Sequence, residues 1–247
     1  MNLRDFFNRY NKVALAFSGG VDSAFLLQQA IENKADITAY YVKSSFQPDF
    51  ELEDAKRLAE ELGARLKVLN VDVLEDEKVV LNSEKRCYYC KKTIFGSILQ
   101  EVRKDGYEVL LDGTNYSDDY EDRPGMKAKE ELKVLSPLRL CKLTKEEIRK
   151  FSKQKGLFTW DKPSYSCLAT RIPSNTPISK QDLVRTEKGE DFLRILGFVD
   201  FRLRLLGDSA KLQVKEKDLE KVIEHRAEIV EELSKYYSNI LLDLEVR

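Results

Sequence analysis

Three groups of residues in this 247-residue chain carry functional groups at spacings that could do chemistry. They are the hexapeptide Ser18-Gly19-Gly20-Val21-Asp22-Ser23, the thiols of Cys87, Cys90 and Cys167, and the guanidinium groups of Arg202 and Arg204. Glycines beside hydroxyls are typical of a phosphate-binding loop, since they let the backbone approach an anion closely. Thiols serve as metal ligands or nucleophiles, and paired arginines bind phosphate or carboxylate groups.

The hexapeptide follows an apolar run at Val13 to Phe17 and opens a predicted helix from Asp22 to Glu32. At such a junction, backbone N–H groups and the positive end of a helix dipole face one point, where a phosphate is the expected guest. The carboxylate of Asp22 makes sense beside phosphates mainly if a magnesium ion lies between them. The alternative is a strand-to-helix turn with an Asp or Ser cap. The loop is neither a Walker A motif nor a Gly-x-Gly-x-x-Gly motif.

Cys87 and Cys90 form a Cys-x-x-Cys pair at the start of a predicted helix, where the dipole favours thiolates. A redox dithiol would suit a thioredoxin-like chain, which this is not. Half of a zinc site would need two more ligands, and the only histidine, His225, is most simply a surface residue. Cys167 could supply a third thiolate, whereas Cys141 is predicted to be a small buried filler.

Arg202 and Arg204 alternate with apolar residues in a predicted strand, so both guanidinium groups should point to one face. A paired fork of this kind suits a substrate phosphate or carboxylate. The alternative is two arginines on a solvated strand face.

The elements that must position these groups alternate between strand and helix over the first 115 residues, which predicts a parallel sheet with helices on both faces. Predicted strands are 13–17, 37–42, 66–71 and 109–112, and predicted helices are 22–32, 52–62, 91–104 and 144–155. Gly63 should cap the second helix, and Thr144 and Glu147 have the spacing of a capping box.

A change of composition between Asp161 and Pro177, which is rich in Pro, Ser and Thr, indicates a linker or an ordered loop. A helix at 180–196, strands at 201–206 and 210–214, and a last helix from 218 to about 237 should follow it. We therefore predict a domain over residues 1–160, an interdomain loop over 161–177 that carries Cys167, and a smaller α+β domain over 178–247.

The composition narrows the class of protein. Hydrophobic residues make up 42% and charged residues 34% of the chain, which argues against a disordered chain and a membrane protein. The N-terminus lacks the apolar region of a secretion signal, so we expect a cytoplasmic location. Lys and Arg total 42 against 43 Asp and Glu, so nucleic acid is an unlikely partner. Four cysteines are too few for a disulfide scaffold.

In its strand–loop–helix setting the hexapeptide resembles the PP-loop pyrophosphatase family, in which Ser-Gly-Gly-x-Asp-Ser binds the phosphates of ATP. The resemblance implies an adenine nucleotide alpha hydrolase-like α/β fold and cleavage of ATP between the α and β phosphates, which leaves a substrate adenylylated. The ATP-binding residues that it implies are Ala16, Phe17, Ser18, Gly19, Gly20, Val21, Asp22, Ser23, Val42 and Gly113.

Further blocks extend the resemblance over nearly the whole chain. They are Arg86 to Lys92, Asp112-Gly113-Thr114-Asn115, Asp119, Asp122-Arg123-Pro124-Gly125, Ser136-Pro137-Leu138, Lys162-Pro163, Cys167 to Pro173, Glu190, Leu196-Gly197-Phe198 and Arg202-x-Arg204. Together they resemble the LarE-type sulfur transferases of nickel-pincer nucleotide biosynthesis. The resemblance implies conversion of a carboxylate of a pyridinium dicarboxylate mononucleotide to a thiocarboxylate, with release of AMP and pyrophosphate.

The same resemblance assigns catalytic roles to Cys167, Asp22 and Glu190 and substrate binding to Arg171, Arg202 and Arg204. Some members carry one cysteine, matching Cys167, which gives up its sulfur and becomes dehydroalanine. Others carry three, matching Cys87, Cys90 and Cys167, and bind a [4Fe-4S] cluster whose open iron can take an exogenous sulfide. The presence of all three favours the cluster form. The expected cofactors are ATP, Mg²⁺ and the cluster, and the expected partners are a nucleotide substrate and a sulfide donor; a homo-oligomer stays open.

The chain departs from the family pattern at Leu206, Lys211 and Gln213, where His, Arg and Glu are usual, and at Ser174-Asn175, where Tyr-Gly is usual. The ATP site is therefore better defined than the acceptor site. A PP-loop tRNA thiolase, which would prefer a basic surface, and an ATP-binding module without chemistry are the alternatives.

Overall fold

The computed structural model describes residues 1–118 and 124–246. These residues form two compact units. The N-terminal unit consists of Met1–Asp76 and Lys85–Ser164, and the C-terminal unit of Glu77–Glu84 and Tyr165–Arg247. Asp119, Asp122 and Arg123, which take part in the family resemblance, lie outside the described residues.

The N-terminal unit is built on a four-stranded parallel sheet in the order β3-β2-β1-β4. Its strands are β1 (Lys12–Ala16), β2 (Asp36–Lys43), β3 (Arg65–Asn70) and β4 (Leu110–Leu111). Strand β1 is nearly all apolar and pairs with β2 on one side and with β4 on the other. It is therefore buried on both faces, as strands of parallel α/β sheets are.

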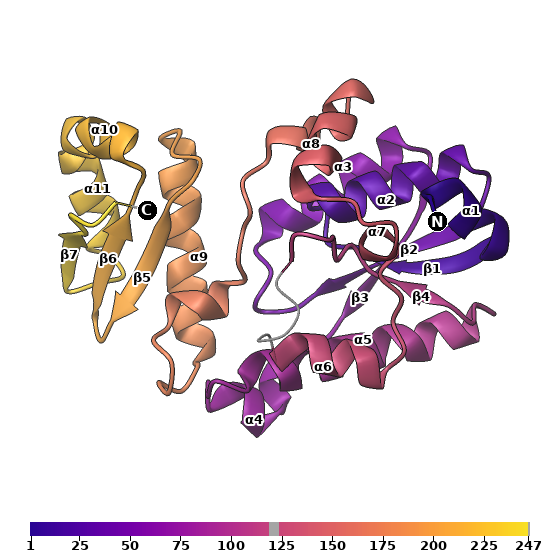
Figure 1. Cartoon of the computed structure of the whole chain (residues 1–247). Coiled ribbons are helices and arrows are strands. Elements are labelled where there is room, and N and C mark those ends of the chain that lie inside the picture. The colour runs from indigo at the N-terminus through magenta and orange to yellow at the C-terminus, as the bar shows by residue number, and fades with distance from the viewer. Residues whose placement is uncertain (119–123, 247) are drawn as a thin grey trace. The chain divides into compact units, whose positions relative to one another are not determined.

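Helices cover both faces of this sheet, which confirms the predicted α/β class (Figure 1). One face carries α1 (Leu3–Arg9), α2 (Val21–Glu32), α3 (Asp49–Glu61), α7 (Pro137–Leu140) and α8 (Lys145–Gln154), and the other carries α5 (Arg86–Lys104), with α6 (Pro124–Glu131) against α5. Alternate residues of β1 serve the two cores: Val13 and Leu15 pack with α2 and α3, and Ala14 packs with α5. The capping box of Thr144 with Glu147 is present at the start of α8.

The C-terminal unit contains a three-stranded sheet in the order β5-β6-β7. Its elements are α4 (Glu77–Val80), α9 (Lys180–Ile195), β5 (Arg202–Leu206), β6 (Ser209–Gln213), α10 (Leu219–Glu224), α11 (Arg226–Leu233) and β7 (Asn239–Leu242). Strand β6 is antiparallel to β5 and parallel to β7. Short 3-10 helices lie at η1 (Val73–Glu75), η2 (Phe158–Asp161), η3 (Leu168–Arg171) and η4 (Glu216–Asp218).

Residues 77–84 join the C-terminal unit although residues on both sides of them belong to the other unit. Asn82 is buried and donates from Nδ2 to the carbonyl oxygens of Pro173 (2.9 Å) and Thr176 (3.0 Å). Its own carbonyl accepts from the amide of Asn175 at 2.9 Å. These bonds attach residues 77–84 to the segment that follows Cys167.

The predicted single helix from 218 to about 237 is wrong. The chain forms α10 and α11 with a break at His225, whose ψ of 15° is not helical. Ile223 and Val230, assigned to one apolar face, are 64% and 41% exposed, so no continuous face is buried that would hold one long helix together. Residues 239–242 form β7 beside β6 instead. None of the described helices combines the length and the apolar run that a membrane span requires.

Candidate active site

The phosphate loop connects β1 to α2 and is held by the side chains of its two serines. The Ser23 hydroxyl accepts from the amide of Ser18 at 3.3 Å, lies 3.2 Å from the Ser18 hydroxyl and donates to the carbonyl of Gly20 at 3.1 Å. Helix α2 begins at Val21 with Gly20 as its N-cap and no side-chain cap. Its first amides therefore keep the unpaired hydrogens that a helix N-terminus offers to an anion.

Two glycines let other segments approach this loop closely. Gly19 has a φ of +71°, and a Cβ there would lie 3.2 Å from the Cβ of Ala55 in α3. A Cβ on Gly113, which follows β4, would lie 2.8 Å from the backbone nitrogen of Ser23 and 3.1 Å from its Cα. Only glycine fits at position 113 without displacing the first turn of α2.

Asp22 lies in the first turn of α2, and its side chain is 21% exposed. Its Oδ2 is 2.5 Å from Lys145 Nζ, and its Oδ1 accepts from Asn115 Nδ2 at 3.4 Å. Burial raises the pKa of Asp22 above its usual range, although the Lys145 ammonium acts in the opposite direction. Burial makes the negative charge of this carboxylate costly, so a cation placed beside it stabilises the charged form. Lys145 was not predicted: the capping box marks the start of α8, but the sequence does not show where its first residue points.

The other residues implied for ATP binding lie at the carboxyl ends of the two central strands. Ala16 ends β1, and the amide of Phe17 donates to the carbonyl of Tyr40 in β2 at 2.9 Å. Phe17 packs in the core with α2, whereas Val42 of β2 packs in the core on the opposite face. The hydrogen bond of Phe17 to β2 thus holds the backbone at the point where β1 leads into the phosphate loop.

The network around Asp112 holds the segment that follows β4. Asp112 is buried with Lys129 of α6, whose Nζ lies 2.5 Å from Asp112 Oδ2. Asp112 Oδ1 accepts from Ser136 Oγ at 2.6 Å, and Oδ2 accepts from Thr114 Oγ1 at 2.7 Å. Both buried charges are paired, and this arrangement fixes the backbone that carries Gly113 and Asn115.

The thiols are distributed over both units. Cys87 and Cys90 lie in the first turns of α5, the former exposed and the latter half-buried, and Arg86 donates from Nη2 to Cys87 Sγ at 3.7 Å. Cys167 is half-buried in the C-terminal unit, where it is the N-cap residue of η3. Within residues 1–118 and 124–246, the structure brings together no group of three or more Cys, His, Asp or Glu side chains suited to a metal ion.

Glu190 and Arg171 form a fully buried ion pair in the C-terminal unit, with both side chains 0% exposed. Arg171 Nε lies 2.7 Å from Glu190 Oε1, and Nη2 lies 3.1 Å from Oε2. Burial alone would raise the pKa of Glu190, but the hydrogen bonds and charge of Arg171 reverse this effect and lower it. Glu190 is thus held as a carboxylate inside the unit.

Arg202 and Arg204 do not form a paired fork. Arg202 is 4% exposed, donates from Nη1 to the Phe201 carbonyl at 2.6 Å and lies over the ring of Tyr165. Arg204 is exposed and donates to the side chain of Gln213 and, at 3.0 Å, to the carbonyl of Thr170. The strand alternation was read correctly, but the two guanidinium groups have different partners.

Arg204 lines a cavity of about 430 Å³ in the C-terminal unit. Its walls also include Leu206, Lys211, Gln213 and Ser174, four of the five positions that depart from the family pattern. No residue that lines the cavity is acidic, and the positive charges of Arg204 and Lys211 favour an anionic ligand. The departures therefore change the lining of one cavity.

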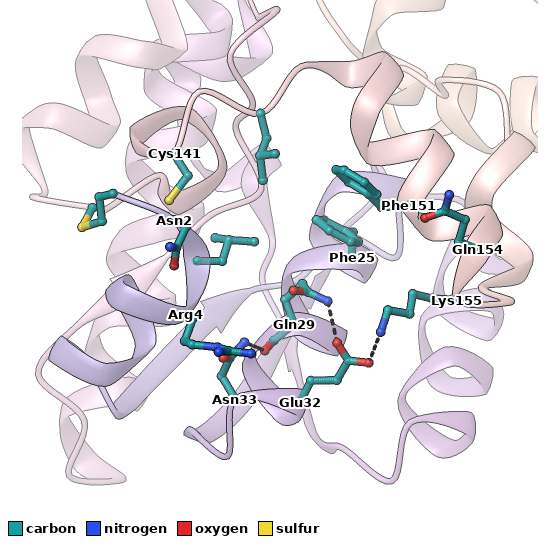
Figure 2. Close-up of a pocket in the computed structure, with 13 residues that line it drawn as sticks. Asn2, Arg4, Phe25, Gln29, Glu32, Asn33, Cys141, Phe151, Gln154 and Lys155 are labelled. Atoms are coloured by element: carbon teal, nitrogen blue, oxygen red, sulfur yellow. Dashed lines mark hydrogen bonds and ion pairs between the residues drawn. The ribbon is translucent and has the colours of Figure 1, made fainter.

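A second cavity, of about 800 Å³, lies in the N-terminal unit between α1, α2 and α8 (Figure 2). The rings of Phe25 and Phe151 stack in it with centroids 6.0 Å apart, and Glu32 pairs with Lys155. Cys141 lines it, so the predicted filler is only half-buried, and burial raises the pKa of its thiol. The cavity runs along α2 from Phe25 to Asn33, whereas the phosphate loop precedes the N-terminal end of the helix.

Comparison with known proteins places this geometry in a family. Residues 12–86 match the family model described as Queuosine biosynthesis protein QueC. An uncharacterized protein of Methanocaldococcus jannaschii is 33% identical over 99% of this chain and 94% of its own length. The pyridinium-3,5-bisthiocarboxylic acid mononucleotide synthase of Lactiplantibacillus plantarum is 31% identical over 83% of this chain and 75% of its own length. The chain belongs to the LarE family.

Membership of the LarE family confirms the resemblance read from the motifs and makes the chain an ATP-using, sulfur-transferring enzyme. A more distant similarity reaches the tRNA-specific 2-thiouridylase MnmA of Pseudothermotoga lettingae, 29% identical over 41% of this chain and 36% of that protein. This similarity covers less than half of either chain.

Gly113→Ala should weaken ATP binding by this LarE-family enzyme, because the added methyl group must displace backbone at Ser23. Overpacking of this kind costs about 1–3 kcal/mol of unfolding free energy. Gly96→Ala in α5 is the matched control, since a Cβ there meets nothing within 4 Å. Calorimetric titration with ATP and urea unfolding measure both effects; equal ATP affinity in the two variants would contradict the assigned role of Gly113.

Glu190→Gln should lower the unfolding free energy of the C-terminal unit by about 3–5 kcal/mol near neutral pH, the usual cost of breaking a buried ion pair. Because folding lowers the pKa of Glu190 from its ordinary value of 4.5, this stabilisation is present above that pH and is lost as the pH falls below it. The difference between wild type and variant should therefore shrink in acid. Urea unfolding across pH checks this, with the exposed Glu228→Gln as control; a difference independent of pH would refute it.

Proposed function

We propose that this LarE-family enzyme activates a carboxylate of a pyridinium dicarboxylate mononucleotide with ATP and replaces one of its oxygens with sulfur. The observation that carries the proposal is the identity shared with the synthase of Lactiplantibacillus plantarum over 83% of the chain, together with a phosphate loop of the required geometry. In the first step a carboxylate oxygen attacks the α phosphorus and pyrophosphate leaves. In the second a sulfur nucleophile attacks the acyl carbon, AMP leaves, and a thiocarboxylate results.

The phosphate loop would bind the triphosphate through the first amides of α2 and the hydroxyls of Ser18 and Ser23. Asp22 would hold Mg²⁺, since its half-buried carboxylate already attracts the ammonium of Lys145. The ion, when bound, would neutralise charge on the phosphates. Lys145 now pairs with Asp22. When Mg²⁺ binds Asp22 instead, the ammonium of Lys145 would be free to contact the same phosphates.

Arg204 and Lys211 are the groups that we propose for the anionic part of the acceptor. Both line the 430 Å³ cavity: Arg204 is exposed, and Lys211 is half-buried and paired with Asp243 at 2.7 Å. Arg171 also lines the cavity, but it is buried in its ion pair with Glu190, and Arg202 is buried beside the Phe201 carbonyl. A phosphate or carboxylate suits two cations on one wall. The unusual lining residues Leu206 and Gln213 would then adjust which acceptor fits.

For the sulfur source we propose the three-cysteine form. Cys87, Cys90 and Cys167 would ligate a [4Fe-4S] cluster, whose ligands in proteins are usually thiolates. The donor set fits chemically: Cys87 and Cys90 lie one turn apart at the start of α5, and Arg86 donates from Nη2 to Cys87 Sγ at 3.7 Å. The cluster, when bound, would supply an open iron for an exogenous sulfide. Cys167 as a sacrificial donor is the competing form.

A tRNA thiolase is the second candidate, favoured by the similarity to MnmA over 41% of the chain. Against it stands the charge balance of 42 basic and 43 acidic residues. Filter binding of tRNA at physiological salt separates the two, because a thiolase must retain tRNA and a nucleotide sulfur transferase need not.

Asp22→Asn should fold normally but lower Mg²⁺-dependent pyrophosphate release by about 10- to 100-fold, the usual loss when a metal site is perturbed. Asp49→Asn is the control, because Asp49 is an 80% exposed carboxylate paired with Lys43. Release of pyrophosphate is measured by a coupled assay at varied Mg²⁺. Wild-type rates in Asp22→Asn would remove this residue from the mechanism, and no release from wild type with any acceptor would indicate a binding module.

Replacing Cys87, Cys90 or Cys167 with Ala should each reduce iron and acid-labile sulfide in anaerobically purified protein, together with activity. Cys141→Ala should change neither the iron and sulfide content nor the activity, since this thiol lines the 800 Å³ cavity and is not one of the proposed cluster ligands. Intact-mass spectra before and after turnover give a second readout. If Cys167 instead loses the mass of hydrogen sulfide once per turnover, while Cys87→Ala and Cys90→Ala stay active, the sacrificial form is the correct one.

A further inference from the structure

The segment from Tyr165 to Arg171, which carries Cys167, is tied at both ends to one buried carboxylate. At one end the Tyr165 hydroxyl donates to Glu190 Oε2 at 2.6 Å. At the other, Arg171 donates to Glu190 through Nε at 2.7 Å and through Nη2 at 3.1 Å. Glu190 belongs to α9, so the segment closes a loop on that helix.

Glu190 is fully engaged by protein donors. Besides Tyr165 and Arg171, it accepts from the amide of Leu203 at 3.0 Å, and Arg194 Nη2 lies 3.5 Å from it. Its side chain is 0% exposed. A carboxylate with this many donors and no contact with solvent is suited to hold structure rather than to exchange a proton with a substrate.

The remaining nitrogen of Arg171 holds the backbone around Cys167. Nη1 donates to the carbonyl of Ser166 at 3.0 Å, to the carbonyl of Cys167 at 3.4 Å and to Thr170 Oγ1 at 2.8 Å. The Cys167 carbonyl also accepts from Thr170 through its amide (2.9 Å) and its hydroxyl (2.8 Å). The peptide of Cys167 is thereby fixed by charge-assisted bonds that begin at Glu190.

We infer that Glu190, Arg171 and Tyr165 form a clamp that sets the position of Cys167. The three are positioning residues: they act on the sulfur chemistry through Cys167, and neither Glu190 nor Arg171 needs to touch a reactant. The value of the clamp to the enzyme rests on the proposed role of Cys167. The contacts themselves do not depend on whether that thiol ligates a cluster or donates its sulfur. Tyr165 is the member that no family motif pointed to.

Tyr165→Phe tests the clamp, because it removes only the hydroxyl that closes one end. Loss of a hydrogen bond to a charged group should speed local opening of the segment about tenfold. Hydrogen exchange of the full-length chain is followed by mass spectrometry in a peptide spanning 165–172, which contains the amide of Thr170. Arg171→Lys, which keeps the charge but loses the bridging nitrogen, should have the same effect and serves as the second variant.

Tyr237→Phe is the matched control in the same unit. Tyr237 is also buried, its hydroxyl lies 3.5 Å from Thr186 Oγ1, and Arg185 lies over its ring. Among the described residues these contacts are to α9 and not to the segment of Cys167. Unchanged exchange at 165–172 in Tyr165→Phe, or equal acceleration in Tyr237→Phe, would overturn the clamp.

A kinetic readout separates positioning from general loosening. Tyr165→Phe should lower kcat for sulfur transfer and leave KM for ATP unchanged, since the phosphate loop is built in the N-terminal unit. A rise in KM for ATP equal to the fall in kcat would contradict a positioning role. If the chain transfers no sulfur at all, the exchange experiment still decides the clamp, because it requires neither ATP nor acceptor.

Discussion

The proposed ATP site depends on the close approach of glycine backbone, which carries no side chain, to the first turn of α2. Gly113 passes so near Ser23 that a Cβ would lie 2.8 Å from the Ser23 nitrogen, and Gly19 has the positive φ that an L side chain disfavours. This approach brings the carboxyl ends of β1 and β4 and the start of α2 to one place. The unpaired amides at the start of the helix then face a space that no side chain of Gly19 or Gly113 fills. A phosphate group needs such a space to reach these amides.

Buried charge maintains that approach. Asp112 follows β4 and pairs with Lys129, while Ser136 and Thr114 satisfy its remaining lone pairs. A buried pair without these hydrogen bonds would cost more to desolvate than its attraction returns, so the hydroxyls are essential to it. The same device recurs in the other unit, where Glu190 and Arg171 are buried and fully hydrogen-bonded. In both units a buried ion pair fixes the backbone of a proposed site residue, Gly113 in one unit and Cys167 in the other. Neither pair presents its charge to a ligand.

Features set by neighbouring residues were predictable from the sequence. The phosphate loop, the strand before it and the capping box of Thr144 each depend on residues within a few positions of one another. Features set by distant partners were not: Lys145 meets Asp22 across 123 positions, and residues 77–84 join a unit whose main part begins at Tyr165. Alternation likewise placed Arg202 and Arg204 on a strand, but burial under Tyr165 decided that only Arg204 lines the cavity.

We propose above all that this enzyme couples the cleavage of ATP to the exchange of a carboxylate oxygen for sulfur. The most direct measurement incubates the full-length chain with ATP, Mg²⁺, sulfide and a pyridinium dicarboxylate mononucleotide, and quantifies AMP, pyrophosphate and the acceptor by mass spectrometry. We expect AMP and pyrophosphate in equal amounts, each equal to the number of acceptor oxygen atoms replaced by sulfur. Cleavage of ATP to ADP and phosphate, or AMP formed while the acceptor gains no sulfur, would contradict it.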